Sequence, residues 1–348
     1  MKQTTATYII VGAGLSGLTT AYALHQQGET DIIILEARDR IGGRILTKDG
    51  IDLGATWFQD HHEHISSMLE HLNIEKFHQY SEGKSVLVYN SMAPAHYFEN
   101  DPSYPAAYRI AGGTAAIIQE LAKFHQEKIY TNTSVSHIEE VEDEIVLTTN
   151  TGKFKASKVI LTIPPKTASL LTFTPELPAS LMETMQQTHT WMSNAMKVGL
   201  TFKTPFWRAK QLSGTLIGQI GCVTELYDHC GAKEEVFALM GFVNEALRDV
   251  AAEERKSRIL EHLQKYLGIE VLDYVTYEEK DWSQDVHTNS GNIVKSIYMS
   301  PRYGNPIFQE FYSNGKLLFS GAETSPIHGG YMDGAIFSGL NAAKKLIS

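Results

Sequence analysis

The stretch YIIVGAGLSG, residues 8–17, decides the fold of this protein. A β-branched run enters three glycines at the spacing GxGxxG, which are Gly12, Gly14 and Gly17. Apolar residues at helical spacing follow, and a second apolar run, Ile32–Leu35, ends at Glu36. The order strand, glycine loop, helix, strand and acid is that of a βαβ unit that binds a dinucleotide.

Each part of this unit has a physical task. Gly12 permits the tight turn, Gly14 lets backbone N–H groups approach a pyrophosphate, and Gly17 lets helix and strand pack closely. Glu36 stands where a carboxylate accepts hydrogen bonds from ribose hydroxyls, and its charge disfavours a 2′-phosphate. FAD or NAD is therefore favoured over NADP, and the alternative is a glycine turn with an ordinary surface acid. The residues predicted to contact the cofactor from this loop are Gly12, Gly14, Leu15, Ser16 and Gly17.

Composition excludes several classes of protein. The chain has 348 residues, 43% of them hydrophobic, and a net charge of −10. It contains no long basic run, which argues against a nucleic-acid partner. Its two cysteines, Cys222 and Cys230, form no disulfide framework, which favours a reducing, cytoplasmic location. No signal-peptide pattern and no run of about 20 apolar residues is present, so we expect no membrane association. The oligomeric state is left open.

The next segment separates FAD from NAD. Residues 37–58 read ARDRIGGRILTKDGIDLGATWF, with a predicted hairpin turned at Asp49-Gly50. An NAD dehydrogenase would continue with further strand–helix units at this point. Arg44 carries a fork of donors that suits a pyrophosphate, and GATW at residues 54–57 brings backbone and an aromatic edge close to a ligand. FAD is therefore the predicted cofactor.

These motifs resemble the opening of the flavin-dependent amine oxidase family, which includes monoamine and polyamine oxidases. The resemblance recurs in order along the chain, so that this sequence is similar to a short form of the family. The segments that carry it are VGAGLSGL, LEARDRIGGR and DLGATWF, then RIAGGTAAIIQELAKF from residue 109, VILTIPP from 159, MKVGLTFKTPFW from 196, EKDWS from 279, and LLFSGAETSPIHGGYMDGAIFSGLNAAKKL from 317.

The resemblance implies roles for particular residues. Lys197 matches the family lysine that holds a water near flavin N5, and its place before VGLTF favours this role over the alternative, an ordinary strand lysine. Tyr331 matches one of two aromatic rings that enclose the substrate amine, and the N–H of Met332 would face the flavin ring. Val135 would contact adenine through its backbone. The remaining implied cofactor contacts are Glu36, Arg44, Ala55, Thr56, Trp57, Trp282, Glu323 and Gly330.

The motifs also predict an α/β architecture with two parts. The first is a Rossmann-like FAD-binding domain, with a parallel sheet and helices, built from residues 1–74, 101–187 and 287–348. The second is a smaller substrate domain with a mixed or antiparallel sheet, built from residues 75–100 and 188–286.

The sequence departs from the family pattern at two points. The covalent members attach FAD through a cysteine after the tryptophan motif, and residues 283–304 contain none, so we predict non-covalent FAD. The second substrate ring should lie near Val294, where no aromatic stands, and Tyr298 or His328 are candidate substitutes. The run DHHEH, residues 60–64, is interpreted as a polar helix start, and no metal site is predicted, because a separated second group of ligands is lacking.

The function implied by the resemblance is an FAD-dependent oxidase. It would take hydride from an amine to flavin N5, and O₂ would then reoxidise the flavin to give an imine, its aldehyde and hydrogen peroxide. Two alternatives stay open at this stage. One is a superfamily flavoprotein acting on C–C or nicotinamide substrates, and the other is an FAD-bound subunit that needs a partner.

Overall fold

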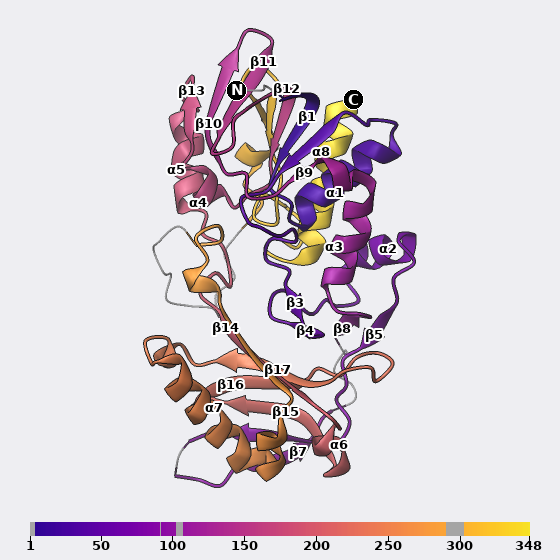
Figure 1. The fold of residues 1–348 in the computed structure, drawn as a ribbon, viewed down its shortest axis with the longest axis vertical. Coiled ribbons are helices and arrows are strands. Elements are labelled where there is room, and N and C mark those ends of the chain that lie inside the picture. Colours follow the sequence, from indigo (N-terminus) through magenta and orange to yellow (C-terminus); the bar gives the residue numbers. More distant parts are fainter. Residues whose placement is uncertain (1–3, 91, 102–106, 290–302) are drawn as a thin grey trace.

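The computed structural model describes residues 4–90, 92–101, 107–289 and 303–348. Two large sheets organise them, one above the other in Figure 1. The upper sheet has nine strands, in the order β13-β10-β11-β12-β1-β2-β9, with β20 also paired to β12 and β19 paired to β20. Their bounds are β1 Thr4–Val11, β2 Ile32–Leu35, β9 Ile129–Tyr130, β10 Val135–Val141, β11 Glu144–Thr149, β12 Lys153–Leu161, β13 Thr172–Thr174, β19 Phe311–Tyr312 and β20 Leu317–Phe319.

The centre of the upper sheet is parallel, as the βαβ pattern predicts. Strand β1 pairs in parallel with β2 on one side and with β12 on the other, and β12 pairs in parallel with β20. The helix after the glycine loop is α1, Leu15–Gln26. Because the strands are parallel, their carboxyl ends meet at one edge, where the glycine loop and Glu36 lie.

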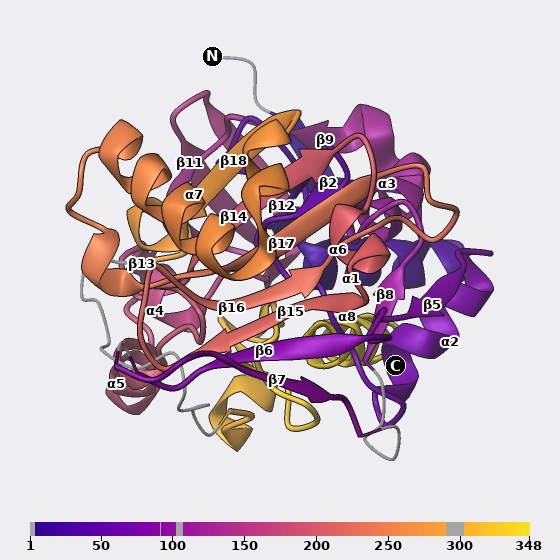
Figure 2. The same cartoon turned by 90° about the horizontal axis from the view of Figure 1, so that it is seen from below.

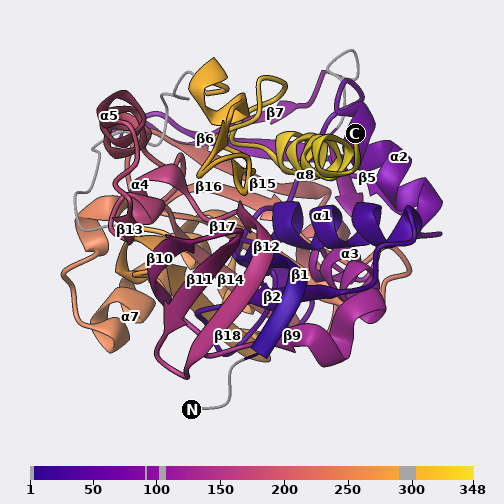
Figure 3. The same ribbon diagram turned by 90° about the horizontal axis from the view of Figure 1, so that it is seen from above.

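Both faces of the upper sheet are covered, which explains its continuous apolar strands. Ile10 faces a core shared with four helices, which are α1, α2 (Glu63–His71), α3 (Ala115–Ala122) and α8 (Met332–Ile347). Ile9 points to the opposite core, closed by α4 (Pro165–Ala168) and α5 (Ala179–Gln187). Figure 3 shows α1 and α8 side by side over this sheet.

The close packing of α1 against α8 depends on one small residue of the C-terminal motif. A Cβ atom built at Gly339 would lie 2.7 Å from the carbonyl oxygen of Ser16 and 2.8 Å from Cβ of Thr19. Any larger side chain would therefore push the two helices apart. This contact joins the two glycine-rich segments of the sequence, although more than 300 residues separate them.

The lower sheet has seven strands in the order β18-β14-β17-β16-β15-β6-β7 and is antiparallel except between β15 and β6 (Figure 2). Its strands are β6 Lys84–Val88, β7 His96–Glu99, β14 Met196–Phe202, β15 Leu212–Gly218, β16 Val223–Asp228, β17 Phe237–Val243 and β18 Thr276–Asp281. Helix α7, Ala252–Leu267, packs on one face through Ile259, Leu263 and Leu267. That these strands fold as a separate substrate domain stays a prediction.

The other face of the lower sheet meets a hairpin from the upper part. The hairpin strands are β3, Thr47–Lys48, and β4, Ile51–Asp52, turned at Asp49-Gly50 as predicted. Ile51 and Leu53 pack on Ala238 and Met240 of β17. In β14, Met196 and Val198 face the α7 core, so Lys197 points to the hairpin side.

Smaller elements complete the chain. A two-stranded sheet joins β5, Lys76–His78, to β8, Tyr108–Ile110, and α6 spans Phe206–Ala209. The 3₁₀ helices are Lys123–Lys128, Glu245–Leu247, Ile269–Asp273, Trp282–Gln284 and Pro306–Gln309. Among the helices of the described residues, none has the length and apolar character needed to cross a bilayer.

Candidate active site

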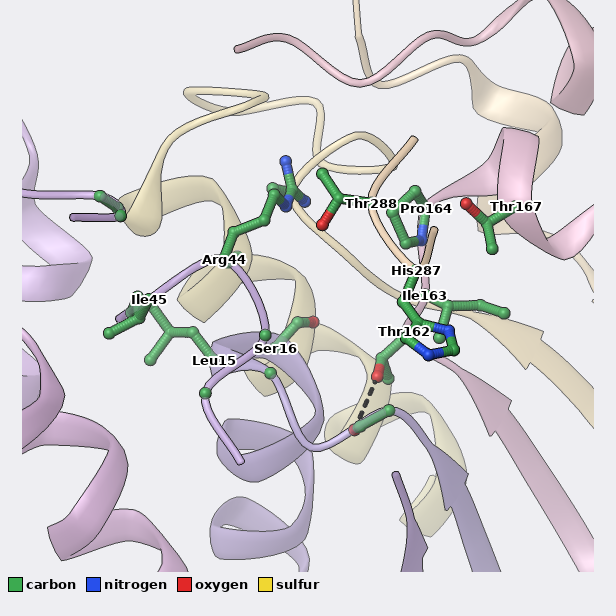
Figure 4. A pocket seen from close by; sticks show the side chains of 18 of the residues that line it. Leu15, Ser16, Arg44, Ile45, Thr162, Ile163, Pro164, Thr167, His287 and Thr288 are labelled. Atoms are coloured by element: carbon green, nitrogen blue, oxygen red, sulfur yellow. Dashed lines mark hydrogen bonds between the residues drawn. The ribbon is translucent and has the colours of Figure 1, made fainter. Parts of the chain in front are cut away.

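A long cavity of about 390 Å³ runs from the glycine loop of the upper sheet to the hairpin side of the lower sheet. At one end it is lined by the loop after β1 and by Glu36 at the end of β2. At the other end it is lined by Lys197 of β14, Phe242 of β17 and Tyr331 before α8. Figure 4 shows Leu15, Ser16 and Arg44 on one side of its middle part, and Pro164, His287 and Thr288 on the other.

At the glycine-loop end, Glu36 is fixed by backbone donors. The carboxylate is 3% exposed, and its Oε2 accepts from the N–H of Ala13 at 2.9 Å. Its Oε1 accepts from the N–H of Arg38, also at 2.9 Å. A Cβ atom built at Gly14 would meet nothing nearer than the Cα of Gly43, at 4.0 Å, so the loop leaves room for a ligand beside its backbone.

Arg44 lines the middle of the cavity and is held by a buried acid. Its Nη2 donates to Oε2 of Glu323 at 2.9 Å, and its Nη1 lies 2.7 Å from Oε1 of the same carboxylate. The Glu323 side chain is 1% exposed and does not line the cavity. Glu323 therefore orients the guanidinium, whose remaining donors suit a phosphate group.

Lys197 is the buried cation of the opposite end. Its Nζ donates to three oxygens, the carbonyls of Asp52 at 3.2 Å and Gly54 at 2.7 Å and Oγ1 of Thr56 at 2.9 Å. Burial lowers the pKa of Lys197 from 10.5 to about 7. When the ammonium is charged, all three of its N–H groups are engaged by the protein, so a water could be held only by the neutral amine or in exchange for one of these acceptors.

A buried polar group lies behind Lys197. The carboxylate of Asp52 accepts from the hydroxyl of Thr47 at 2.6 Å and from the N–H of Thr114 at 2.8 Å, and the imidazole of His229 accepts from the N–H of Asp52. Burial lowers the pKa of His229 to about 4, so this ring is neutral at pH 7. No sequence motif predicted this group, because its members come from three separate segments, the β3–β4 hairpin, Thr114 and His229.

The aromatic end of the cavity centres on Tyr331, which is 38% exposed. The ring of Trp191 meets it edge-on with centroids 5.0 Å apart, and the centroid of the His62 ring lies 5.2 Å from that of Tyr331. Tyr303 helps to hold the Trp191 segment, since its hydroxyl accepts from the backbone N–H of Trp191 at 2.7 Å. Trp57 and Phe242 flank Lys197, with ring centroids 5.2 and 5.0 Å from Nζ.

With this geometry in place, comparison with known proteins identifies the chain. The family model described as flavin containing amine oxidoreductase matches residues 15–93 and 92–347. The chain belongs to the flavin-containing amine oxidoreductase family. This membership makes it an FAD-dependent oxidoreductase, as the resemblance implied.

Several curated members of this family are similar over most of their length. A probable flavin-containing monoamine oxidase A of Dictyostelium discoideum is 24% identical over 97% of this chain and 96% of its own. The putrescine oxidase of Kocuria rosea is 25% identical over 80% of this chain and 82% of its own. At these levels of identity, the substrate of a relative does not by itself establish the substrate of this protein.

Solved structures support the fold. A double mutant of putrescine oxidase superposes with a TM-score of 0.85 at 23% identity, covering 99% of this chain and 100% of that one. Cyclohexylamine oxidase from Brevibacterium oxydans superposes with a TM-score of 0.83 at 21% identity, covering 97% of this chain and 98% of that one. The FAD-binding fold with a second sheet is therefore confirmed.

The cavity fits the cofactor of this family. It extends well past the glycine loop, and its apolar far end offers space for a ring system as well as a dinucleotide. Both cysteines of the chain lie away from it, Cys222 beside β16 and Cys230 buried in the lower core. FAD is therefore the cofactor, and it is held without a thioether bond.

Most of the predicted site residues meet at this one cavity. Those that line it are Gly12, Gly14, Leu15, Ser16, Glu36, Arg44, Ala55, Thr56, Trp57, Val135, Lys197, Trp282, Gly330, Tyr331 and Met332. Gly17 lies in α1 against the Gly12 carbonyl, and Glu323 acts through Arg44, so neither lines it. The roles of these residues stay predictions.

Other predicted residues lie elsewhere, and some lining residues were not anticipated. Val294 and Tyr298 fall outside the described residues. His328 faces His61 and His62 and does not line the cavity. Trp191 and Phe242 were not predicted from the sequence, because they approach the cavity from segments that carry no glycine motif. Arg38 also lines the cavity without having been predicted, and its Nη2 donates to Asp285 at 2.6 Å and to Thr288 at 2.9 Å.

Proposed function

We propose that this protein oxidises an amine at the aromatic end of the cavity, giving an imine that hydrolyses to an aldehyde. FAD held along this cavity would supply the acceptor for the hydride, and O₂ would take up the electron pair and two protons as hydrogen peroxide. One observation supports this most strongly: a single cavity connects the dinucleotide loop to Lys197, Trp191 and Tyr331. A substrate placed there reaches the far end of the cofactor's site.

The aromatic walls favour the reactive form of the substrate. An amine must be neutral to lose hydride, because an ammonium has no lone pair to stabilise the developing iminium. Removal from water lowers the pKa of an amine, and the rings of Trp57, Trp191 and Phe242 provide such an environment. The ring of Tyr331 would align the nitrogen by direct contact.

The charges around the cavity favour an apolar monoamine over a diamine. Among the described residues that line it, Glu36 is the one carboxylate, and Glu36 lies at the dinucleotide end. The chain segments outside the described residues contain no Asp or Glu. A second ammonium group would therefore be buried without a counter-charge, which is costly. We infer a primary amine with an aryl or alkyl substituent.

Lys197 would act in the oxidative half of the cycle. Its ammonium, buried between Trp57 and Phe242, would favour the negative charge that develops on O₂ as it accepts electrons. The three oxygen acceptors hold the Nζ atom in one place, so no reorganisation is needed at that step. This role needs the charged form of the side chain.

The test is anaerobic bleaching of the purified yellow protein, followed by hydrogen peroxide measurement in air. Benzylamine and hexylamine should bleach the flavin and release peroxide, whereas putrescine and spermidine should do so far more slowly. Preference for the diamines would overturn the substrate class. Bleaching by nicotinamide isomers or polyenes, and by no amine, would support the alternative superfamily activity. A flavin that no substrate bleaches would point to a partner-dependent subunit.

A further inference from the structure

A cluster of three histidines lies next to the aromatic end of the cavity, outside its lining. His61 and His62 precede α2, and His328 precedes α8. One ring nitrogen from each lies within 4.8 Å of the others. The ring centroids are 4.4 Å apart for His61 and His62, 4.7 Å for His62 and His328, and 5.3 Å for His61 and His328.

The third histidine supplies what the sequence pattern lacked. The run DHHEH alone has no separated second ligand group, and the packing of α2 beside α8 brings His328 to it from across the chain. We propose that His61, His62 and His328 form a binding site for Zn²⁺ or a similar borderline divalent cation. Three imidazoles with a fourth position open to solvent are a ligand set that zinc accepts.

An acid behind the cluster orients one of the ligands. Nδ1 of His328 lies 2.7 Å from Oδ2 of Asp333, a carboxylate that is fully buried. This contact fixes the proton on Nδ1 and leaves Nε2 as the coordinating atom, the arrangement found around many metal-bound histidines. Oδ1 of Asp333 accepts from the N–H of Ile65, so the acid is itself anchored.

The three rings must move slightly closer together to bind a cation, and this rearrangement limits the affinity of the site. With metal–nitrogen bonds of about 2.0–2.1 Å, ligand atoms in a tetrahedron lie roughly 3.3 Å apart, so the rings must close in. Because the His61 side chain is exposed, we expect it to shift toward His62 and His328 when a cation binds. Nδ1 of His62 accepts from the backbone N–H of Gln59 at 3.1 Å. To coordinate the cation, His62 must either give up this hydrogen bond or flip its ring. We therefore expect micromolar affinity.

The position of the cluster links it to amine oxidation. The His62 ring lies 5.2 Å from the ring of Tyr331. A cation held by His62 would restrain the neighbouring Tyr331 ring. Zinc binding is thus expected to alter the Michaelis constant for the amine, although the site itself does not depend on the proposed substrate.

The experiment uses the FAD-loaded protein after chelator treatment and removal of the chelator. Calorimetric titration with Zn²⁺ should give one ion per chain. His61→Asn and His328→Gln should each weaken binding at least about tenfold, with the flavin spectrum and circular dichroism unchanged. His71→Asn, at the exposed end of α2 and outside the cluster, serves as the control and should bind like the unmodified protein.

Two results would overturn the proposal. One is the absence of binding by the unmodified protein at 100-fold the proposed micromolar range. The other is equal binding of Zn²⁺ by the unmodified protein and His61→Asn, which would mean that the three histidines only pack against one another and do not bind the cation. Cu²⁺ provides a second measurement, because its electron paramagnetic resonance spectrum should show nitrogen ligands that are lost in His328→Gln.

Discussion

The Nζ atom of Lys197 donates a 2.9 Å hydrogen bond to Oγ1 of Thr56, across the boundary between the two sheets. Thr56 belongs to the loop after the hairpin of the upper part, and Lys197 to the buried strand β14 of the lower part. The bond thus joins this loop to the second sheet at the far end of the cavity. The charge state of Lys197 is consequently set by the way the two parts are assembled.

Replacing Lys197 with methionine should leave FAD bound and slow reoxidation of the flavin by O₂ by about tenfold or more. The physical reason is loss of the one buried ammonium among the described residues that line the aromatic end. Stopped-flow mixing of reduced protein with O₂ measures this rate. Lys203→Met, an exposed lysine just beyond the end of β14, is the matched control. An unchanged trace for Lys197→Met would refute the role.

The reoxidation rate should depend on pH around 7. Because burial lowers the pKa of Lys197 to about 7, its ammonium is present below that pH and lost above it, so the rate should fall as pH rises through 7. The same shift affects stability: the unfolded chain binds more protons between pH 7 and 10.5, so this group makes folding more favourable as pH rises through that window.

Replacing Thr56 with valine should move this inflection to lower pH. The hydroxyl accepts a hydrogen bond from the charged form of Lys197, and its loss favours the neutral amine. Thr56→Ser keeps the acceptor and should keep the inflection. The pH dependence of the reoxidation rate should therefore differ between the two variants. Identical profiles would mean that Thr56 does not influence the pKa of Lys197.

Truncating the aromatic end should weaken amine oxidation without loss of cofactor. Tyr331→Ala and Trp191→Ala remove rings that lie 5.0 Å apart, and each should raise the Michaelis constant or lower the rate of anaerobic flavin reduction. Tyr331→Phe and Trp191→Phe retain a ring and should keep most of the rate. If Tyr331→Ala instead expels FAD, the tyrosine is structural.

The flavin should be released by acid. Precipitation with trichloroacetic acid should leave the yellow colour in the supernatant, because neither cysteine lies at the cavity. Colour kept in the protein pellet would contradict non-covalent binding. Free FAD in the supernatant is identified by its absorbance and fluorescence.

Replacing Gly339 with a larger residue should destabilise the protein by disturbing the packing of α1 against α8, without changing a residue proposed to act on the substrate. A Cβ atom there would lie 2.7 Å from the Ser16 carbonyl oxygen, so Gly339→Val should cost about 1–3 kcal/mol of unfolding free energy. Since Ser16 lines the cavity in the loop predicted to bind the cofactor, FAD affinity should fall as well. Chemical denaturation measures the first effect. Gly315→Val is the comparison variant: a Cβ there meets nothing within 4 Å but φ is +80°, so it reports the cost of backbone strain without a packing clash.

The sequence by itself determined the parts of the fold that rest on local geometry. The spacing of Gly12, Gly14 and Gly17, the apolar run of β2 and the acid Glu36 define a βαβ unit, because backbone approach and strand burial constrain residue type at each position. The turn at Asp49-Gly50 followed from the same kind of local rule, since both residues adopt positive φ. Family motifs then placed Lys197 and Tyr331 among the candidates.

Only the tertiary structure decided how distant segments meet. Trp191 faces Tyr331, Glu323 pairs with Arg44, and His328 joins His61 and His62, and none of these contacts leaves a periodic signal in the sequence. Each depends on helix and sheet packing that brings loops from opposite ends of the chain to one place. The charge state of Lys197 belongs to the same class, because burial and three oxygen acceptors arise only when the two sheets close on the hairpin.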